Sequence, residues 1–475
     1  MQKIINKYGV LILVLLGYSI LFVVCAHDPF YGDAKSTISR LAVQTYYSNF
    51  KIIFYPQGLD PGHPVLFPMM HAALWKVFGT SLIVSHCVTY FFSLLLLIAA
   101  YKVDVHYRLK GILLLFVACN PIILALSASL NTHIVLAACT LWYYLFYLNK
   151  KVWGMVCIAS LMLLTHNEGL LIFVAFMAAQ IIVDRKLPPR LLIAFTPWLA
   201  WLFIHQHYTG WFLFPPEYDN FRGLGKPLVL VKNIGIIAWR LLDFGLFLIT
   251  LTGLYAIFKN RKKEFFVPLT FSFLLILAIW ATVKFAIAHR YFIPVFLLMS
   301  IPAAHYFLKQ KGIYLLICIL VLLSGSFWYY PGKQLSDANL MYRNYFNIYD
   351  EISKSNFADF NLYSTAPNES SAYITHIAPK KFNGLLKIKN INDKSHDPIN
   401  AVIESNLNGT LPDSIKNLIA HWPYKTYESG PAYINVYVSP NLAPSDHSGE
   451  AKNWHHRRVG AFEQWLKSLK SKLQP

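Results

Sequence analysis

The residues of this chain that could do chemistry gather at the ends of long apolar stretches. Asp28 and Asp33 follow the first stretch, and Asp60 and His63 stand in the sequence Leu-Asp-Pro-Gly-His-Pro. Later turns add Asn131, His133, His166, Asn167, Glu168, Lys284, His289, Arg290 and Tyr291. Carboxylates can accept a proton from a hydroxyl group, and cations can stabilise a departing phosphate. The set favours transfer of a sugar from a phosphate carrier to an acceptor.

The apolar stretches that must position these residues are long enough to cross a membrane. The chain has 475 residues, of which 56% are hydrophobic and 14% are charged. Soluble domains carry about 25% charged residues, and a bilayer core requires roughly 20 apolar residues per helix. Eleven stretches meet or approach this length: 5–26, 81–101, 111–129, 132–149, 152–167, 169–183, 191–208, 236–258, 265–288, 291–308 and 312–330. We predict a polytopic α-helical membrane protein with about 11 transmembrane helices over residues 1–330.

The net charge of +19 is distributed in short basic clusters between these stretches, for example at 108–110, 150–151, 185–190, 259–263 and 309–311. Such clusters indicate the cytoplasmic side and require no nucleic acid partner. The alternation places residues 27–80, the turns near 130 and 167, the loop 209–235 and the tail from 331 outside. The polar residues at the helix ends are therefore expected at the extracytoplasmic face of the cytoplasmic (inner) membrane.

Two segments outside the membrane have patterns of their own. Residues 27–80 form a first loop with two expected surface helices, at 34–50 and 71–78. Residues 331–475 are polar, with strand patterns at 360–364, 385–391 and 432–438, and predict a small C-terminal α/β domain. The basic stretch 454–473 fits an amphipathic helix on the membrane surface or a frayed tail. The six cysteines lie in apolar stretches and suggest no metal site.

Four motifs in order carry a family resemblance: His27-Asp-Pro-Phe-Tyr-Gly-Asp33, Asp60-Pro-Gly-His-Pro64, Leu164-Thr-His-Asn-Glu-Gly169 and Arg290-Tyr-Phe-Ile-Pro294. Over about residues 1–330 the chain resembles the GT-C superfamily. It is most similar to the family 39-like branch of dolichyl-phosphate-mannose–protein mannosyltransferases and the bacterial lipid A aminoarabinose transferase. Two positions depart from that pattern: Val65 replaces a second proline, and His166 replaces a common arginine.

The resemblance implies a glycosyltransferase that moves a sugar from a polyprenyl phosphate to a protein, lipid or glycan acceptor by direct displacement. It implies that Asp33 is the catalytic carboxylate, with Asp60 beside it. Arg290 would bind the donor phosphate together with His63 and Tyr291, whereas Glu168 and His166 would contact substrate. The branch is generally not thought to require a metal, so no cofactor is expected.

Each assignment has a structural alternative. Asp33 could cap the helix that follows it, Asp60 could form a turn, and Arg290 could lie at the interface without a ligand. Glu168 and His166 could satisfy backbone groups of a tight turn, and Asp243 is expected to pair with Arg240. A transporter of lipid-linked glycans, or a noncatalytic membrane subunit, are the alternative functions. The absence of an evident internal repeat weakens the transporter hypothesis.

Overall fold

The computed structural model describes residues 2–30, 34, 38–54, 62–213, 227–283, 287–330, 338–353, 355, 362–364, 389–390, 399, 401–405 and 413–441. Asp33, Asp60, Lys284 and the stretch 454–473 lie outside these residues, so the predictions made for them are not addressed by the structure. The chain divides into two compact units. The first comprises Met1–Phe327 with Ala338–Leu340, and the second Trp328–Asp337 with Met341–Pro475.

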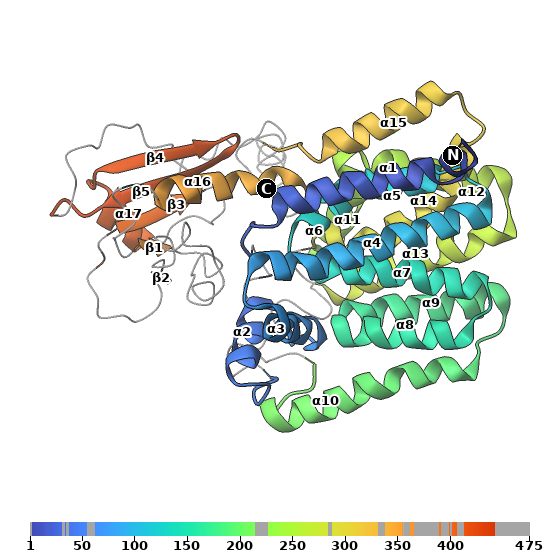
Figure 1. The fold of residues 1–475 in the computed structure, drawn as a ribbon, viewed down its shortest axis with the longest axis horizontal. Helices are drawn as coiled ribbons and strands as arrows, with labels where there is room; N and C mark the ends of the chain where they lie inside the picture. Colours follow the sequence, from blue (N-terminus) through green and yellow to red (C-terminus); the bar gives the residue numbers. More distant parts are fainter. Residues whose placement is uncertain are drawn as a thin grey trace, which may run out of the picture. The chain divides into compact units, whose positions relative to one another are not determined.

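The first unit is a bundle of apolar helices (Figure 1). Its helices include α1 (Gln2–Cys25), α4 (Leu82–Tyr107), α5 (Ile112–Ala118), α6 (Pro121–Ala128), α7 (His133–Leu148), α8 (Val152–Thr165), α9 (Glu168–Asp184), α10 (Phe195–Thr209), α11 (Pro227–Leu242), α12 (Phe247–Asn260), α13 (Phe266–Thr282), α14 (Ile293–Phe307) and α15 (Gly312–Gly325). The core of the bundle includes α7 and α14, because most of their side chains are buried.

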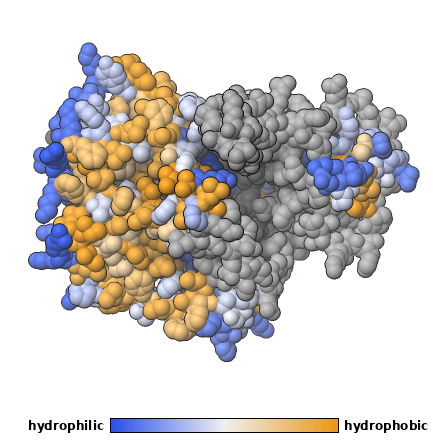
Figure 2. All heavy atoms as spheres, turned by 180° about the vertical axis from the view of Figure 1, so that it is seen from behind, coloured by the Kyte–Doolittle hydropathy of each residue, from blue (hydrophilic) through white to orange (hydrophobic). Residues whose placement is uncertain are grey.

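The outward faces of the bundle are apolar. Leu13, Ile20 and Val23 of α1 and Phe203 of α10 are all more than 60% exposed. Figure 2 shows the same pattern as a broad hydrophobic surface with hydrophilic residues along one edge. Among the described residues, three helical spans are long and apolar enough to cross a membrane: Tyr8–Cys25, Leu82–Tyr107 and Lys263–Thr282. Large exposed apolar faces on such helices are what lipid contact requires.

The stretch 111–129 is two short helices rather than one span. Asn120 follows the first of these helices and caps the second, because its side-chain oxygen accepts hydrogen bonds from the backbone N–H groups of Ile122 and Ile123. Pro121 stands at the first position of α6, where its missing N–H group costs nothing. The sequence pattern missed this break because both halves are uniformly apolar.

The stretch 236–258 is also broken, and the prediction of one continuous span there is wrong. α11 and the short 3-10 helix η4 (Asp243–Gly245) meet α12 at an angle of 105°. Phe244 and Gly245 both have positive φ angles, which a continuous helix does not allow. A Cβ atom on Gly325 would lie 2.1 Å from the Phe244 carbonyl oxygen, so this glycine lets α15 approach the break closely.

The first loop contains two short helices, as predicted. α2 (Arg40–Tyr47) and α3 (Leu66–Phe78) pack against each other, with the rings of Tyr46 and Trp75 6.3 Å apart. α3 begins five residues earlier than the pattern indicated. The polar His71, at which the predicted helix began, is fully buried and donates a hydrogen bond from Nδ1 to the Phe67 carbonyl oxygen.

The second unit contains a five-stranded mixed sheet in the order β2-β1-β3-β5-β4. The strands are β1 (Leu362–Ser364), β2 (Lys389–Asn390), β3 (Ala401–Ser405), β4 (Tyr424–Ser429) and β5 (Ala432–Val438), with helices α16 (Asn344–Ser353) and α17 (Asp413–Ile419). β1 pairs in parallel with β2 and β3, whereas β5 is antiparallel to both β3 and β4. The predicted α/β character is confirmed, although the sequence pattern did not identify β3 and β4.

Candidate functional site

The polar residues singled out in the sequence lie at one end of the bundle. α7, α9 and α14 begin at this end, and α8 ends there. The basic clusters 150–151, 185–190 and 309–311 follow or precede the opposite ends of these helices. A 16-residue helix such as α7 is about 24 Å long, so the two ends are well separated. The alternation deduced from charge agrees with this arrangement of the helices.

His133, the first residue of α7, is held on both sides of its ring. Its Nδ1 atom lies 2.8 Å from the side-chain oxygen of Asn131, and its Nε2 atom lies 2.7 Å from a carboxylate oxygen of Glu168. The same Asn131 oxygen accepts a hydrogen bond from the backbone N–H group of His133, at 3.0 Å. All three residues are more than 90% buried. The imidazole is therefore fixed in orientation before any ligand arrives.

The turn between α8 and α9 brings Glu168 to His133. α8 ends at Thr165, and Glu168 opens α9, where the positive end of the helix favours a carboxylate. A Cβ atom on Gly169 would lie 2.1 Å from the Met162 carbonyl oxygen, so only glycine permits so close an approach of the two helices. The backbone N–H group of Glu168 donates a long hydrogen bond to His166 Nδ1, at 3.3 Å. Part of this turn is thus satisfied internally, as the structural alternative expected.

His63 connects the first loop to this turn. Its ring lies 3.9 Å from that of His166 between centroids, and the His166 ring lies 4.9 Å from that of His133. The side-chain amide of Asn167 donates a hydrogen bond to the Gly62 carbonyl oxygen. Three imidazole rings from three separate segments thus lie next to one another, tilted by 31° and 53°, at the end of the bundle.

The short 3-10 helix η6 (His289–Phe292), which precedes α14, supplies the last two predicted site residues. The Tyr291 ring lies 5.9 Å from the His133 ring, and the Arg290 guanidinium lies 5.5 Å from the Tyr291 ring. Arg290 is only partly buried, so a positive charge stands beside the imidazole cluster and within reach of a ligand. The site residues His63, His166, Glu168, Arg290 and Tyr291 therefore come together in space.

A second cluster of polar side chains links η6 to the break between α11 and α12. His289 Nε2 lies 2.9 Å from the Asp243 carboxylate, and the Arg240 guanidinium lies 3.2 Å from His289 Nδ1. Arg240 also donates a hydrogen bond to the Ile287 carbonyl oxygen. The expected polar link between Arg240 and Asp243 thus includes His289 as the residue between them. The spacing of Arg240 and Asp243 could not indicate a residue 46 positions beyond Asp243.

His133 and Asn131 are the residues whose role the sequence analysis missed. Both appear among the polar residues at the helix ends, but neither belongs to a recognised motif. The available signal is Asn131-Thr-His133 directly before a long apolar stretch, at the same end of the bundle as Glu168. That signal places Asn131 and His133 at the correct end of the bundle, but it does not indicate that His133 contacts Glu168.

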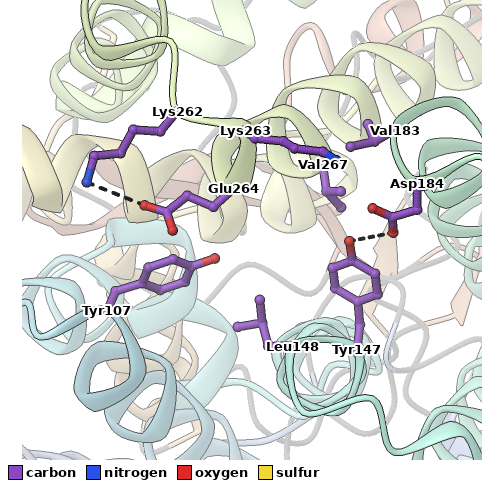
Figure 3. A pocket seen from close by; sticks show the side chains of 9 residues that line it. All are labelled: Tyr107, Tyr147, Leu148, Val183, Asp184, Lys262, Lys263, Glu264 and Val267. Carbon is purple, nitrogen blue, oxygen red and sulfur yellow. Dashed lines mark hydrogen bonds and ion pairs between the residues drawn. The ribbon is translucent and has the colours of Figure 1, made fainter.

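A cavity of about 640 Å³ lies away from this cluster. The candidate site is therefore identified by its polar side chains and not by a cavity. Its lining comes from the opposite ends of α4, α7 and α9 and from the connection between α12 and α13 (Figure 3). Tyr147 donates a hydrogen bond to Asp184 there, and Lys262 lies 3.5 Å from Glu264. The cavity thus belongs to the basic end of the bundle, whereas the motif residues belong to the other.

Comparison with known proteins finds solved structures with a similar fold, but no similar sequence. No protein-family model matches the sequence, and no curated protein matches it either. Two solved structures match over 92% of the chain: ArnT from Cupriavidus metallidurans bound to undecaprenyl phosphate, and the same protein in the apo state. The first has a TM-score of 0.53 at 9% identity and is covered over its full length. The second has a TM-score of 0.54 at 11% identity and is covered over 99%.

This likeness confirms, at the level of the fold, the resemblance that the motifs indicated. It extends beyond residues 1–330, because 92% of the chain is aligned. The exposed apolar helices and the shared architecture both indicate that the protein lies in a membrane. The chain is an integral membrane protein with a fold similar to that of ArnT.

Proposed function

We propose that the protein is a membrane glycosyltransferase that moves a sugar from a polyprenyl phosphate to an acceptor at the extracytoplasmic face of the cytoplasmic membrane. One observation carries the proposal. His63, His133, His166, Glu168 and Tyr291 come from four separate segments of the chain and meet at one end of an apolar bundle. The bundle has the fold of a protein that was crystallised with undecaprenyl phosphate.

The position of the cluster suits a lipid-linked donor. It lies at the ends of membrane-embedded helices, where a lipid head group would lie, and Arg290 offers a cation that a phosphate can bind. The Tyr291 ring beside this guanidinium restricts where the cation can move. The polyprenyl chain could then lie along the apolar outer surface while its phosphate reaches the polar end.

The reaction that fits this site is a single displacement at the anomeric carbon of the donor sugar. Asp33 accepts the proton of the acceptor hydroxyl group, and the acceptor oxygen forms the new bond to the anomeric carbon. The bond from that carbon to the phosphate oxygen breaks, and its electron pair leaves with the polyprenyl phosphate. Arg290 stabilises this leaving phosphate, assisted by His63. Asp60 shapes the site, and Glu168 and His166 contact substrate.

Transfer from a panel of radiolabelled polyprenyl-phosphate sugars in membranes tests the proposal. We compare the wild-type protein with Asp33→Asn and Arg290→Ala at matched expression, and with Asp184→Asn as a control at the opposite end of α9. We expect transfer by the wild type and the control, and its loss in both site variants. Activity that survives in Asp33→Asn would move the base to Asp60 or Glu168. Movement of labelled lipid across the membrane without transfer would favour a transporter.

A further inference from the structure

His133 is held between two oxygen acceptors, and this arrangement requires a cation. The backbone N–H group of His133 points at Asn131 Oδ1, which identifies that atom as the oxygen of the amide. His133 Nδ1, 2.8 Å from the same oxygen, must then carry a proton. The other ring nitrogen, Nε2, lies 2.7 Å from a Glu168 carboxylate oxygen. A lone pair facing a carboxylate oxygen is repulsive, so either a second proton or a metal ion must lie between them.

A third donor at the same place favours the metal ion. The potential ligand atoms of His133, His166 and Glu168 all lie within 4.8 Å of one another; the two histidines are more than 90% buried, and the Glu168 side chain is 11% exposed. A proton can bridge only two of these groups, His133 and Glu168, whereas one divalent ion can bind all three. A metal also requires neutral imidazoles, which suits a place where three histidine rings lie 3.9 and 4.9 Å apart between centroids.

We propose that His133, His166 and Glu168 form a site for a divalent transition-metal ion, with Zn²⁺ the ion that the donor set favours. Two imidazole nitrogens and one carboxylate form a common zinc ligand set, whereas Mg²⁺ and Ca²⁺ prefer oxygen donors. Asn131 acts as the outer support that orients a ligating histidine through its second nitrogen. Ligation by His166 Nδ1 would replace the long contact from the Glu168 backbone, at 3.3 Å.

Small adjustments would complete the site. Two ligand atoms at about 2.1 Å from a tetrahedral ion lie roughly 3.4 Å apart, so His133 Nε2 and Glu168 must separate by less than 1 Å. Three protein ligands leave a coordination position for water or an anion. The site uses side chains that also belong to the proposed transferase site, but binding of the ion does not depend on transfer.

Metal binding by the purified full-length protein tests the proposal without donor or acceptor. The protein carries an affinity tag without histidine, is stripped with EDTA and is titrated with Co²⁺, whose visible absorption reports four-coordinate ligation. We expect one Co²⁺ per chain, displaced by Zn²⁺. His133→Ala and His166→Ala should lose this absorption, Glu168→Gln should weaken it, and Asn131→Ala should reduce affinity by about 10- to 100-fold.

His305→Gln, on α14, is the control for loss of a histidine elsewhere in the bundle, and thermal unfolding in detergent verifies that each variant is folded. Absence of Co²⁺ absorption in the wild type would overturn the proposal. So would equal absorption in the wild type and in folded Glu168→Gln and His166→Ala variants. Because the readout is spectroscopic, a negative result here leaves the proposed transfer reaction standing, and a failed transfer assay leaves the metal site standing.

Discussion

The imidazole Nε2 of His289 lies 2.9 Å from the carboxylate of Asp243, across the break between α11 and α12. Both side chains are about 1% exposed. Asp243 also accepts a hydrogen bond from the Phe244 backbone N–H group, one of the groups that the break removes from the helix ladder. His289 stands directly before Arg290 in η6. A single polar contact therefore stabilises the broken span and anchors the segment that carries the proposed phosphate ligand.

Asp243→Ala should destabilise the protein by about 3–5 kcal/mol, because it removes one partner of a buried pair and the acceptor of the hydrogen bond from the Phe244 N–H group. Asp243→Asn should cost less, about 1–3 kcal/mol, because the amide oxygen can keep one of the two hydrogen bonds. Thermal unfolding in detergent measures both. The matched control is Asp184→Ala, whose bond to Tyr147 lies on an exposed part of the bundle.

The order expected for these variants is wild type and Asp184→Ala above Asp243→Asn, with Asp243→Ala lowest. An Asp243→Ala variant as stable as the control would show that the contact with His289 does not hold the break. The same series, assayed for transfer, separates stability from positioning. A folded Asp243→Asn protein with reduced transfer would indicate that the contact places Arg290.

Gly169→Ala should move Glu168 away from His133. The added Cβ atom would meet the Met162 carbonyl oxygen at 2.1 Å, and a backbone atom cannot rotate aside as a side chain can. We expect a loss of about 1–3 kcal/mol in stability from this overpacking, together with reduced transfer. Thermal unfolding and the transfer assay measure the two effects separately.

Gly17→Ala is the matched control for this substitution. Gly17 lies within α1, and nothing stands within 4 Å of the position that its Cβ atom would take. Alanine should there be neutral or should stabilise the helix by up to about 1 kcal/mol. Equal behaviour of the two variants would contradict the close approach of α8 and α9 at Gly169.

The sequence predicted the helical type of most elements, and the end of the bundle at which their polar residues lie, better than their continuity. Helix ends coincide with the basic clusters because charge is excluded from the membrane core, and this exclusion is readable in composition alone. The breaks at Asn120 and Asp243 are different in kind. Each depends on one side chain that replaces a missing backbone hydrogen bond, in a stretch that is apolar on both sides. Hydropathy averages over such single positions.

For the candidate site as well, the sequence predicted which segments come together but not which side chains contact each other. Motif order predicted that His63, the turn at 165–169 and the segment 290–294 belong to one end of the bundle, and their side chains do meet there. The contact of His133 with Glu168 could not be predicted, because the residues are 35 positions apart on different helices. Which of several polar side chains at one depth face each other depends on helix rotation, and uniformly apolar helices such as α7 encode rotation only weakly.

The buried tyrosine of the second unit makes a prediction about pH. The Tyr437 hydroxyl group donates a hydrogen bond to Glu404, which is fully buried in β3. Burial, followed by the nearby Glu404 carboxylate, raises the pKa of Tyr437 above its ordinary value. A raised pKa means that the folded state holds the proton more tightly. The resulting stability is present below about pH 10, the pKa of an unfolded tyrosine, and is lost as the pH rises above it.

Tyr437→Phe should therefore be less stable than the wild type near pH 8, by about 1 kcal/mol for the missing hydrogen bond. The difference should shrink between about pH 10 and pH 11 as the wild-type phenol becomes costly to keep protonated. Thermal unfolding of the full-length protein over this range measures the difference. Parallel curves for the two proteins at all pH values would contradict the pKa argument.

Tyr291 should affect donor binding through its ring rather than its hydroxyl group. The ring stands 5.5 Å from the Arg290 guanidinium and 5.9 Å from the His133 ring. Tyr291→Ala removes both contacts, whereas Tyr291→Phe retains them. A cation–π contact contributes about 0.5–2 kcal/mol, so the alanine variant should bind polyprenyl phosphate about 2- to 30-fold more weakly. Competition by unlabelled polyprenyl phosphate in the transfer assay measures the change.

Arg290→Lys distinguishes the geometry of this cation from its charge. Lysine keeps the positive charge but lacks the planar fork that pairs with a phosphate and stacks on the Tyr291 ring. If Arg290 binds phosphate as proposed, the lysine variant should fall between the wild type and Arg290→Ala in its inhibition by polyprenyl phosphate, and Tyr291→Ala should then add little to Arg290→Lys. Additive effects of the two substitutions would mean that the ring and the guanidinium act independently, and that Tyr291 does not position Arg290.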